Sequence, residues 1–286
     1  MGRWPDDLKR KWRWLWSQEG FRRRPVAISA RLMVWRARCR LRQAAVVKFP
    51  RWNVRVLLPP RWRGIEKLIF AFREDYEPEL AYLGKALFPR AVFIDVGANL
   101  GIYTLVASSI VGPAGRVIAI EPSFQSLPIL RKNIAINGLT NVLPLSVALT
   151  EKAGSAWLYH GPDPSQNSLG KNPSRNGVGE EVMTETLDSV LLQACVDRVD
   201  VIKMDAEGSE ELILRGATRV LKSERPIVVF EFQPEAAQRL GLSPTGAWDL
   251  LESLRYEFFR TGRHGYLYRL DSPLPGRNVI AIPRKQ

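Results

Sequence analysis

The central part of the chain alternates short apolar runs with longer amphipathic segments. Apolar runs with the length of buried strands lie at residues 91–96, 116–121, 141–148, 199–204 and 227–232. Helical patterns lie at residues 101–111, 123–137, 208–221 and 243–253, and a glycine ends each of the first two. Strands that alternate with helices in this way predict right-handed crossovers and a mostly parallel sheet covered on both faces. We therefore expect a doubly wound α/β fold.

The last part of the chain has a different pattern. Short strand-like segments at residues 256–260, 265–270 and 278–282 are separated by glycine and proline turns. A terminal hairpin on the edge of the sheet fits them. Residues 161–179 are rich in glycine, proline, asparagine and serine, which predicts a surface loop.

Charge divides the chain into two parts. Residues 1–63 hold 18 of the 42 Lys and Arg residues and only three acids, a net charge of +15, while residues 64–286 carry −2. Seven of the nine tryptophans also lie in the first part. We expect a basic, tryptophan-rich N-terminal extension over residues 1–63 and one α/β domain over residues 64–286.

The basic extension predicts contact with an anionic surface. In residues 4–16, tryptophan and leucine recur at helical spacing on one side and basic residues lie away from them, which favours a helix lying on an anionic membrane. Residues 35–42 alternate with period two, which predicts a strand. Nucleic-acid binding through basic and aromatic residues is the less favoured alternative, and a solvated tail is a third. Residues 1–42 should be dispensable for cofactor binding.

The location of the protein follows from weaker signals. Cys39 and Cys195 form no CxxC spacing, no apolar run approaches the roughly 18 residues of a membrane span, and the N-terminus lacks the apolar core of a secretory signal. We expect a cytoplasmic protein that is peripheral on the inner face of the membrane. The sequence does not set its oligomeric state.

The first candidate binding motif follows the first strand of the predicted sheet. Asp95 and Gly97 begin the run DVGANLG, which ends at Gly101 and opens the next helix. In open α/β sheets ligands bind at the carboxyl ends of strands, and glycine lets a ligand approach the backbone. The run is not a GxGxxG dinucleotide loop, and a carboxylate at its mouth suits a cationic sulfonium ligand such as S-adenosylmethionine. Glu121, followed by Pro122, ends the second strand 24 residues after Gly97, where a carboxylate can accept hydrogen bonds from ribose hydroxyls.

A third motif, KMDAEGSE, follows the fourth strand. Lys203, Asp205 and Glu207 place three ionisable groups where a bound methyl donor would point its sulfonium. An acidic first turn of a helix is the plainer interpretation. The motif lies at the carboxyl end of a strand, and this position favours a role in the active site.

Together these motifs resemble the FkbM family of class I S-adenosylmethionine-dependent methyltransferases. The resemblance covers about residues 76–232 through VFIDVGANLGIYT, GRVIAIEPS, LRKNIAINGLTNV, ETLDSV, VDVIKMDAEGSEELILRGA and RPIVVFEF. It implies a Rossmann-like sheet of seven strands and O-methylation of a small-molecule, sugar or lipid-like acceptor. The residues it places around the methionine part of the cofactor are Asp95, Gly97, Ala98, Asn99, Gly101 and Thr104. It places Glu121 at the ribose, and Asp205 and Glu207 at the methyl-transfer site.

The expected reaction is a direct displacement in which an acceptor oxygen attacks the methyl carbon in line with the departing sulfur, accelerated mainly by positioning. Asp205 or Glu207 would be the general base or would hold a divalent metal ion, and the sequence does not choose between them. Two other functions stay open: an RNA methyltransferase that grips RNA with the basic extension, and a membrane or partner adaptor that only binds the cofactor. Weaker candidates are Asn167 and Ser168, which fit part of an acceptor lid or a plain surface loop, and Glu231, which fits either a residue lining the site or the partner of a cation in the core. His160 and His264 lack partners at metal-ligand spacing.

Overall fold

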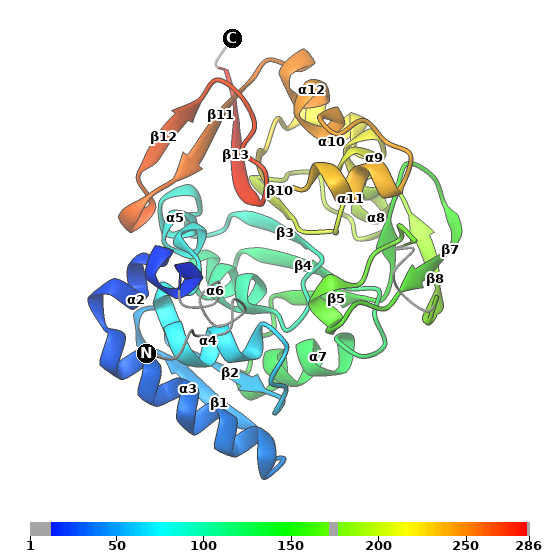
Figure 1. Cartoon of the computed structure of the whole chain (residues 1–286). Helices are drawn as coiled ribbons and strands as arrows, with labels where there is room; N and C mark the ends of the chain where they lie inside the picture. The colour runs from blue at the N-terminus through cyan, green and yellow to red at the C-terminus, as the bar shows by residue number, and fades with distance from the viewer. Residues whose placement is uncertain (1–12, 172–176, 285–286) are drawn as a thin grey trace.

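The computed structural model describes residues 13–171 and 177–284, and its centre is a sheet of eight strands in the order β12-β11-β13-β10-β9-β3-β4-β5 (Figure 1). The five strands at one side pair in parallel: β10 (Ile227–Phe232), β9 (Val201–Met204), β3 (Val92–Val96), β4 (Arg116–Ile120) and β5 (Val142–Leu145). The other three pair antiparallel: β13 (Arg277–Pro283), β11 (Tyr256–Thr261) and β12 (Leu267–Leu270). The doubly wound α/β prediction is confirmed.

The antiparallel edge corrects one expectation and confirms another. The sheet has eight strands rather than the seven that the family resemblance implies, because the short β12 pairs with β11 outside the rest of the sheet. The terminal hairpin predicted for this edge is present as β11 and β12. The last strand, β13, lies between β11 and β10, so it is an inner strand of the sheet.

Apolar side chains alternate between two covered faces of the sheet. In β3, Phe93 belongs to one buried cluster and Ile94 to another, and in β9 Val201 and Ile202 divide in the same way. Strands of a sheet that is buried on both faces are continuous apolar runs, so these strands can be recognised in the sequence. The first face is covered by α4 (Glu66–Phe72), α5 (Pro78–Ala86), α6 (Ile102–Val111) and α7 (Leu127–Ile136). The second is covered by α8 (Leu187–Gln193), α9 (Glu210–Arg215), α10 (Thr218–Ser223) and α12 (Gly246–Ser253).

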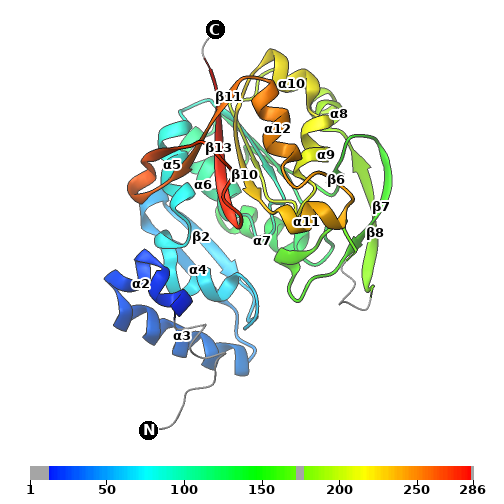
Figure 2. The same ribbon diagram turned by 45° about the horizontal axis from the view of Figure 1, so that its top comes forward.

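Some predicted elements have different bounds. The helix predicted over residues 208–221 is two helices, α9 and α10, separated at Gly216, where a Cβ would lie only 2.2 Å from the carbonyl oxygen of Thr150. The strand predicted over residues 141–148 ends at Leu145. The following Ala148–Leu149 is β6 of a separate three-stranded sheet in the order β6-β8-β7, with β7 at Gly154–Tyr159 and β8 at Gly179–Glu185. Figure 2 shows this small sheet beside α11 (Pro234–Arg239).

The basic N-terminal part contains two further helices and a hairpin. They are α2 (Glu19–Arg23), α3 (Pro25–Arg40) and the antiparallel pair β1 (Ala45–Phe49) and β2 (Val54–Leu58). The prediction of a strand at residues 35–42 is wrong, because α3 continues to Arg40. The buried positions of α3 are Ile28 and Trp35, seven residues apart, so burial follows a helical period. Of the predicted tryptophan-striped helix, residues 4–12 lie outside the described residues, and residues 13–17 are helical.

The hairpin is attached to the α/β part by packing and by hydrogen bonds. Residues of β1 and β2 share a buried cluster with α6 and with the strands of the large sheet. Asn133 of α7 accepts the N–H of Leu57 at 2.6 Å, and Asn137 accepts the N–H of Arg55 at 2.7 Å. Trp35 packs on Phe70 with ring centroids 4.9 Å apart. Within the described residues, no helix has both the length and the apolar character needed to cross a membrane.

Candidate active site

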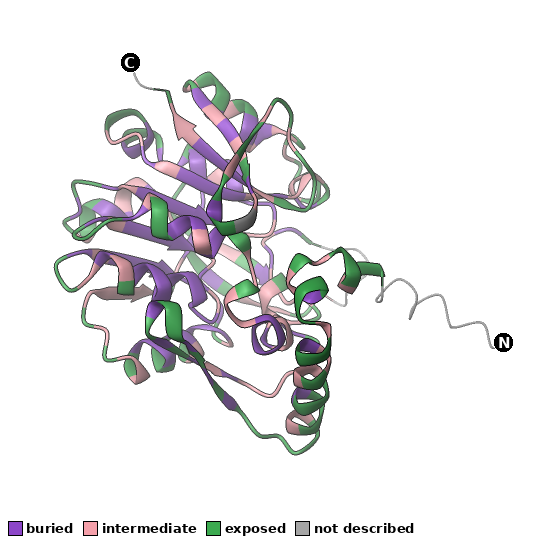
Figure 3. Cartoon of the chain, turned by 90° about the vertical axis from the view of Figure 1, so that its left-hand side faces the viewer, coloured by how far each residue is buried: buried purple, intermediate pink, exposed green. Residues whose placement is uncertain are grey.

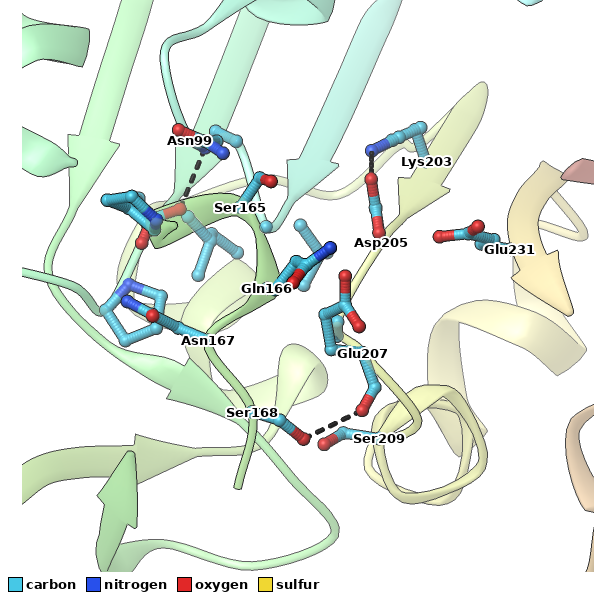
Figure 4. A pocket seen from close by; sticks show the side chains of 18 of the residues that line it. Asn99, Ser165, Gln166, Asn167, Ser168, Lys203, Asp205, Glu207, Ser209 and Glu231 are labelled. Atoms are coloured by element: carbon cyan, nitrogen blue, oxygen red, sulfur yellow. Dashed lines mark hydrogen bonds and ion pairs between the residues drawn. The ribbon is translucent and has the colours of Figure 1, made fainter. Parts of the chain in front are cut away.

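The largest group of predicted site residues meets in one cavity at the carboxyl ends of β3, β4 and β9. The cavity has a volume of about 390 Å³ (Figure 4). Eight predicted residues line it: Gly97, Ala98, Asn99, Glu121, Pro122, Lys203, Asp205 and Glu207. Three others, Asp95, Gly101 and Thr104, lie behind this lining: Asp95 and Thr104 are buried and hydrogen-bonded to each other, and Gly101 caps α6.

The glycine loop is shaped by two close approaches. Gly97 has φ +71°, and a Cβ there would lie 1.9 Å from the carbonyl oxygen of Asp205. Gly101 has φ +88°, and its Cβ would lie 2.5 Å from Leu130 of α7. Only glycine adopts these angles without strain. The loop therefore lies tightly between β9 and α7 and opens its backbone to the cavity.

Glu121 fixes the far side of that loop. One carboxylate oxygen accepts the backbone N–H of Asn99 at 2.8 Å, and the other accepts the N–H of Ser123 at 2.9 Å. Each oxygen has a second lone pair, so the carboxylate can also accept hydroxyl donors from the cavity. Burial raises the pKa of Glu121 to about 7, against the effect of the two N–H donors. The loop role of this residue was not visible in the sequence.

A network of ionised groups around the buried Lys203 lines part of the cavity. The Lys203 ammonium is 3.2 Å from Asp205 Oδ2 and 4.8 Å from the ring centroid of Tyr103. Burial lowers the pKa of Lys203, but the charges of Asp205, Asp95 and Glu77 outweigh this, so its pKa is raised above the ordinary value. Lys203 therefore stays protonated and serves as a counter-ion rather than a proton acceptor.

Asp95 is the most enclosed member of this network. Thr104 donates its hydroxyl to Asp95 Oδ2, while Oδ1 has no hydrogen-bond partner among the described residues. Burial raises the pKa of Asp95, and the nearby Lys203 charge opposes that rise. Asp95 thus joins the end of β3 to the first turn of α6 through Thr104.

Three carboxylates form the other wall of the cavity. Oxygen atoms of Asp205, Glu207 and Glu231 all lie within 4.8 Å of one another. Burial raises the pKa of Glu207 to about 8, with further contributions from the charges of Asp205 and Glu210. Burial and the Asp205 charge raise the pKa of Glu231 to about 9, against a hydrogen bond from Gln233. Like charges this close favour either a retained proton or a bound cation.

The donor set of this carboxylate cluster suits a hard divalent cation. Magnesium, calcium and manganese prefer oxygen ligands, and three carboxylates supply them. The same groups could instead accept a proton from an alcohol. Glu231, which the sequence left as an even choice between site and core, lines the cavity.

Several lining residues were not predicted from the sequence. Tyr76 and Glu77 come from the turn before α5, and Tyr103 comes from the first turn of α6. The Tyr103 hydroxyl donates to Glu77, whose pKa is raised to about 7 by burial and the neighbouring Glu79 charge. Glu77 lies 15 residues before the start of β3 in a segment without a motif, so only the folded chain brings it to the site.

The polar loop over residues 165–168 lines the cavity between Asn99 and Glu207 (Figure 4). The Ser168 hydroxyl donates to the carbonyl oxygen of Glu207 at 2.8 Å, and Asn167 accepts the N–H of Gly161 at 2.9 Å. Asn167 and Ser168 thus line the cavity, which is the position expected for part of an acceptor lid. His160 lies 3.1 Å from Glu180, and His264 lies in the turn between β11 and β12.

A parallel sheet with a glycine loop after its first strand and an acid ending the next strand defines a nucleoside-binding α/β fold. The methyltransferase FkbM domain model matches residues 95–258, more than half of the chain. The chain therefore belongs to the FkbM methyltransferase family, as its motifs indicated.

The chain is similar to two curated relatives and to many solved structures, among them an FkbM methyltransferase. Methyltransferase sdnD of Sordaria araneosa is 27% identical over 153 residues, covering 43% of this chain and 59% of that protein. Hexuronic acid methyltransferase AglP of Haloferax volcanii is 25% identical over 178 residues, covering 62% and 64%. The crystal structure of a methyltransferase FkbM from Methylobacillus flagellatus KT is 18% identical with a TM-score of 0.46, covering 76% and 53%. In each comparison the match spans less than two thirds of the other protein.

Proposed function

We propose that this protein transfers a methyl group from S-adenosylmethionine to a hydroxyl oxygen of a small-molecule, sugar or lipid-like acceptor. Membership of a methyltransferase family supports methyl transfer. The observation that carries the proposal is the cavity itself, which has the glycine loop and Glu121 on one side and three carboxylates on the other. A sugar acceptor draws support from the name of AglP, a hexuronic acid methyltransferase.

The cofactor would lie across the ends of β3 and β4. Its ribose hydroxyls would donate to Glu121, and its methionine part would follow the backbone of Gly97 to Asn99. The methyl group would then point toward Asp205 and Glu207. The Lys203 ammonium, 3.2 Å from Asp205, keeps that carboxylate oriented between the cofactor and the acceptor.

In the reaction, the acceptor oxygen forms a bond to the methyl carbon as the bond from that carbon to the sulfonium sulfur breaks. The sulfur keeps the electron pair, and S-adenosylhomocysteine is the product. The hydroxyl proton must leave, and the carboxylate of Glu207 or Asp205 is the group that we assign to accept it. A base with a pKa near the working pH is effective, which favours Glu207 at about 8. A divalent ion on the same carboxylates would instead acidify the hydroxyl.

The test is cofactor binding followed by turnover with the full chain. Calorimetry should detect S-adenosylmethionine and S-adenosylhomocysteine, and S-adenosylhomocysteine release should be measured with uronic acids, neutral sugars, lipid-linked sugars and RNA. Turnover with a hydroxylated sugar or lipid acceptor supports the proposal. Turnover only with RNA would make the protein an RNA methyltransferase, and cofactor binding with no turnover on any acceptor would favour an adaptor.

A further inference from the structure

Helix α3 has an exposed apolar face on the side opposite its packed face. The buried side of the helix is formed by Ile28 and Trp35. Figure 3 shows that the opposite side is exposed over most of the helix length. Large apolar side chains there have high exposed fractions: Val26 81%, Met33 68%, Val34 50% and Leu41, at the C-cap, 66%. Exposed apolar side chains that recur on one helix face indicate a contact surface.

The positions of these residues form one continuous stripe. Val26, Ala30, Met33, Ala37 and Leu41 are separated by three or four residues, and all are exposed. Residues at this spacing lie above one another on a single helix face. An amphipathic helix normally turns its only apolar side to the core. In α3 the side with Ile28 and Trp35 already packs on the core. The exposed apolar stripe therefore makes no contact with the core.

Arginines border the stripe on both sides. At 100° per residue, Arg36 and Arg40 fall along one border, and Arg31 and Arg38 fall along the other. Arg31 and Arg38 donate to backbone carbonyls of Ala71 and Ala44, which holds them beside the helix. Exposed Arg22, Arg23 and Arg24 precede the helix. An apolar stripe between rows of arginine matches the boundary between lipid tails and anionic headgroups.

We propose that the exposed face of α3 lies on an anionic lipid surface. The occupant is a lipid surface because the stripe is apolar and its borders are cationic, which is the charge complementarity that such a surface requires. Trp14 and Trp16, with exposed fractions of 45% and 49%, lie on the chain just before α2 and suit the headgroup region. The helix would lie in the plane of the membrane rather than cross it.

The proposed lipid-binding face is linked to the region beside the cavity. Arg36 of α3 lies 6.0 Å from the ring centroid of Trp62. Trp62 lines a second hollow of about 590 Å³, with Arg61, Arg63 and His160. Pro164 lines both this hollow and the candidate active site. Binding through α3 would thus bring the lipid surface toward this outer hollow.

The experiment is co-sedimentation of the full chain with vesicles of phosphatidylcholine alone and of phosphatidylcholine mixed with phosphatidylglycerol. We expect binding to the anionic vesicles only. The double variant Met33→Glu/Ala37→Glu should bind about tenfold more weakly, because it places charge in the apolar stripe. Replacing Arg24 and Arg40 with Gln should weaken binding about fivefold per charge at low salt.

Leu192→Glu is the matched control, because Leu192 is an apolar residue of α8 with an exposed fraction of 75%, outside this face. It should bind vesicles like the natural protein, and all variants should keep the natural melting temperature. The proposal is overturned if the natural protein ignores anionic vesicles, or if Met33→Glu/Ala37→Glu binds them unchanged. It is also overturned if sedimentation velocity shows a dimer that only this double variant dissociates, because the face would then be a contact between two copies.

Discussion

Gly97 and Asp205 are in backbone contact at the carboxyl ends of the neighbouring parallel strands β3 and β9. Position 97 can hold no Cβ, since one would lie 1.9 Å from the carbonyl oxygen of Asp205. The two strands also share a hydrogen bond at this height, from the Asp205 N–H to the Val96 carbonyl at 3.0 Å. The glycine loop that would hold the cofactor and the carboxylate that would face the acceptor are therefore one rigid unit.

The first prediction is that Gly97→Ala damages both halves of the site. The added methyl must displace the Asp205 backbone and would adopt a strained positive φ. We expect a loss of about 2 to 4 kcal/mol in the free energy of unfolding, measured by urea titration, together with weaker S-adenosylmethionine binding.

Gly84→Ala is the control for this variant. Gly84 lies within α5, and nothing lies within 4 Å of a Cβ built there. Alanine should stabilise the protein by about 0.5 to 1 kcal/mol by restricting the unfolded chain, without any effect on cofactor affinity. If Gly97→Ala were as stable as the natural protein, the close contact with Asp205 would not restrict the side chain at position 97.

The second prediction concerns pH and cofactor affinity. Burial raises the pKa of Glu121 to about 7, so below pH 7 the carboxyl is mostly protonated and accepts hydrogen bonds poorly. Affinity for S-adenosylmethionine should fall as pH decreases through 7. Because one group titrates, the loss of affinity should approach about tenfold for each pH unit. Glu121→Gln should bind more weakly at pH 8, and calorimetry should find that its affinity depends much less on pH. The same pH slope in both proteins would show that another group controls it.

The sequence was sufficient for the parts of the site that lie next to buried strands. The apolar run ending at Val96 and the one ending at Ile120 are buried on both faces, so their ends and the polar residues beyond them could be located. Asp205 and Glu207 follow Met204 for the same reason. Position relative to a strand end thus located the predicted residues that line the cavity.

The parts that could not be predicted depend on contacts between distant segments. Glu77 reaches the site through its bond with Tyr103. Glu231 was only a weak candidate in the sequence, because its place beside Asp205 depends on the pairing of β10 with β9. The strand wrongly predicted at residues 35–42 has a local cause: the alternating arginines of α3 imitate a period of two. The burial of Ile28 and Trp35, seven residues apart, shows that the true period is helical.

The third prediction separates the acceptor side of the cavity from the cofactor side. Asp205→Asn and Glu207→Gln should lower kcat by about 100-fold or more while changing S-adenosylmethionine affinity little, because general-base catalysis contributes at this level. Single-turnover assays and calorimetry on the same preparations measure the two effects. A loss confined to cofactor affinity would remove both residues from the methyl-transfer step.

The fourth prediction distinguishes a base from a metal ligand. If Glu207 accepts the proton, kcat should rise with pH through about 8, where this carboxyl ionises, and chelators should have no effect. If the three carboxylates hold a divalent ion, chelation should abolish turnover, and magnesium or manganese should restore it. Direct titration of the chelated protein with manganese, followed by electron paramagnetic resonance, detects such an ion without an activity assay.

The last prediction is that Glu231→Gln stabilises the protein at alkaline pH. The pKa of Glu231 is raised to about 9 in the folded state, chiefly by burial. Its contribution to stability is therefore complete below the unfolded value near 4.5 and is lost as pH rises through 9. Glutamine cannot ionise, so the variant should gain on the order of 1 kcal/mol at pH 9 and little at pH 5, measured by thermal unfolding with a chelator present. Glu252→Gln, at an exposed site on α12, should show no such gain, and a gain equal to that of Glu231→Gln would contradict the assignment.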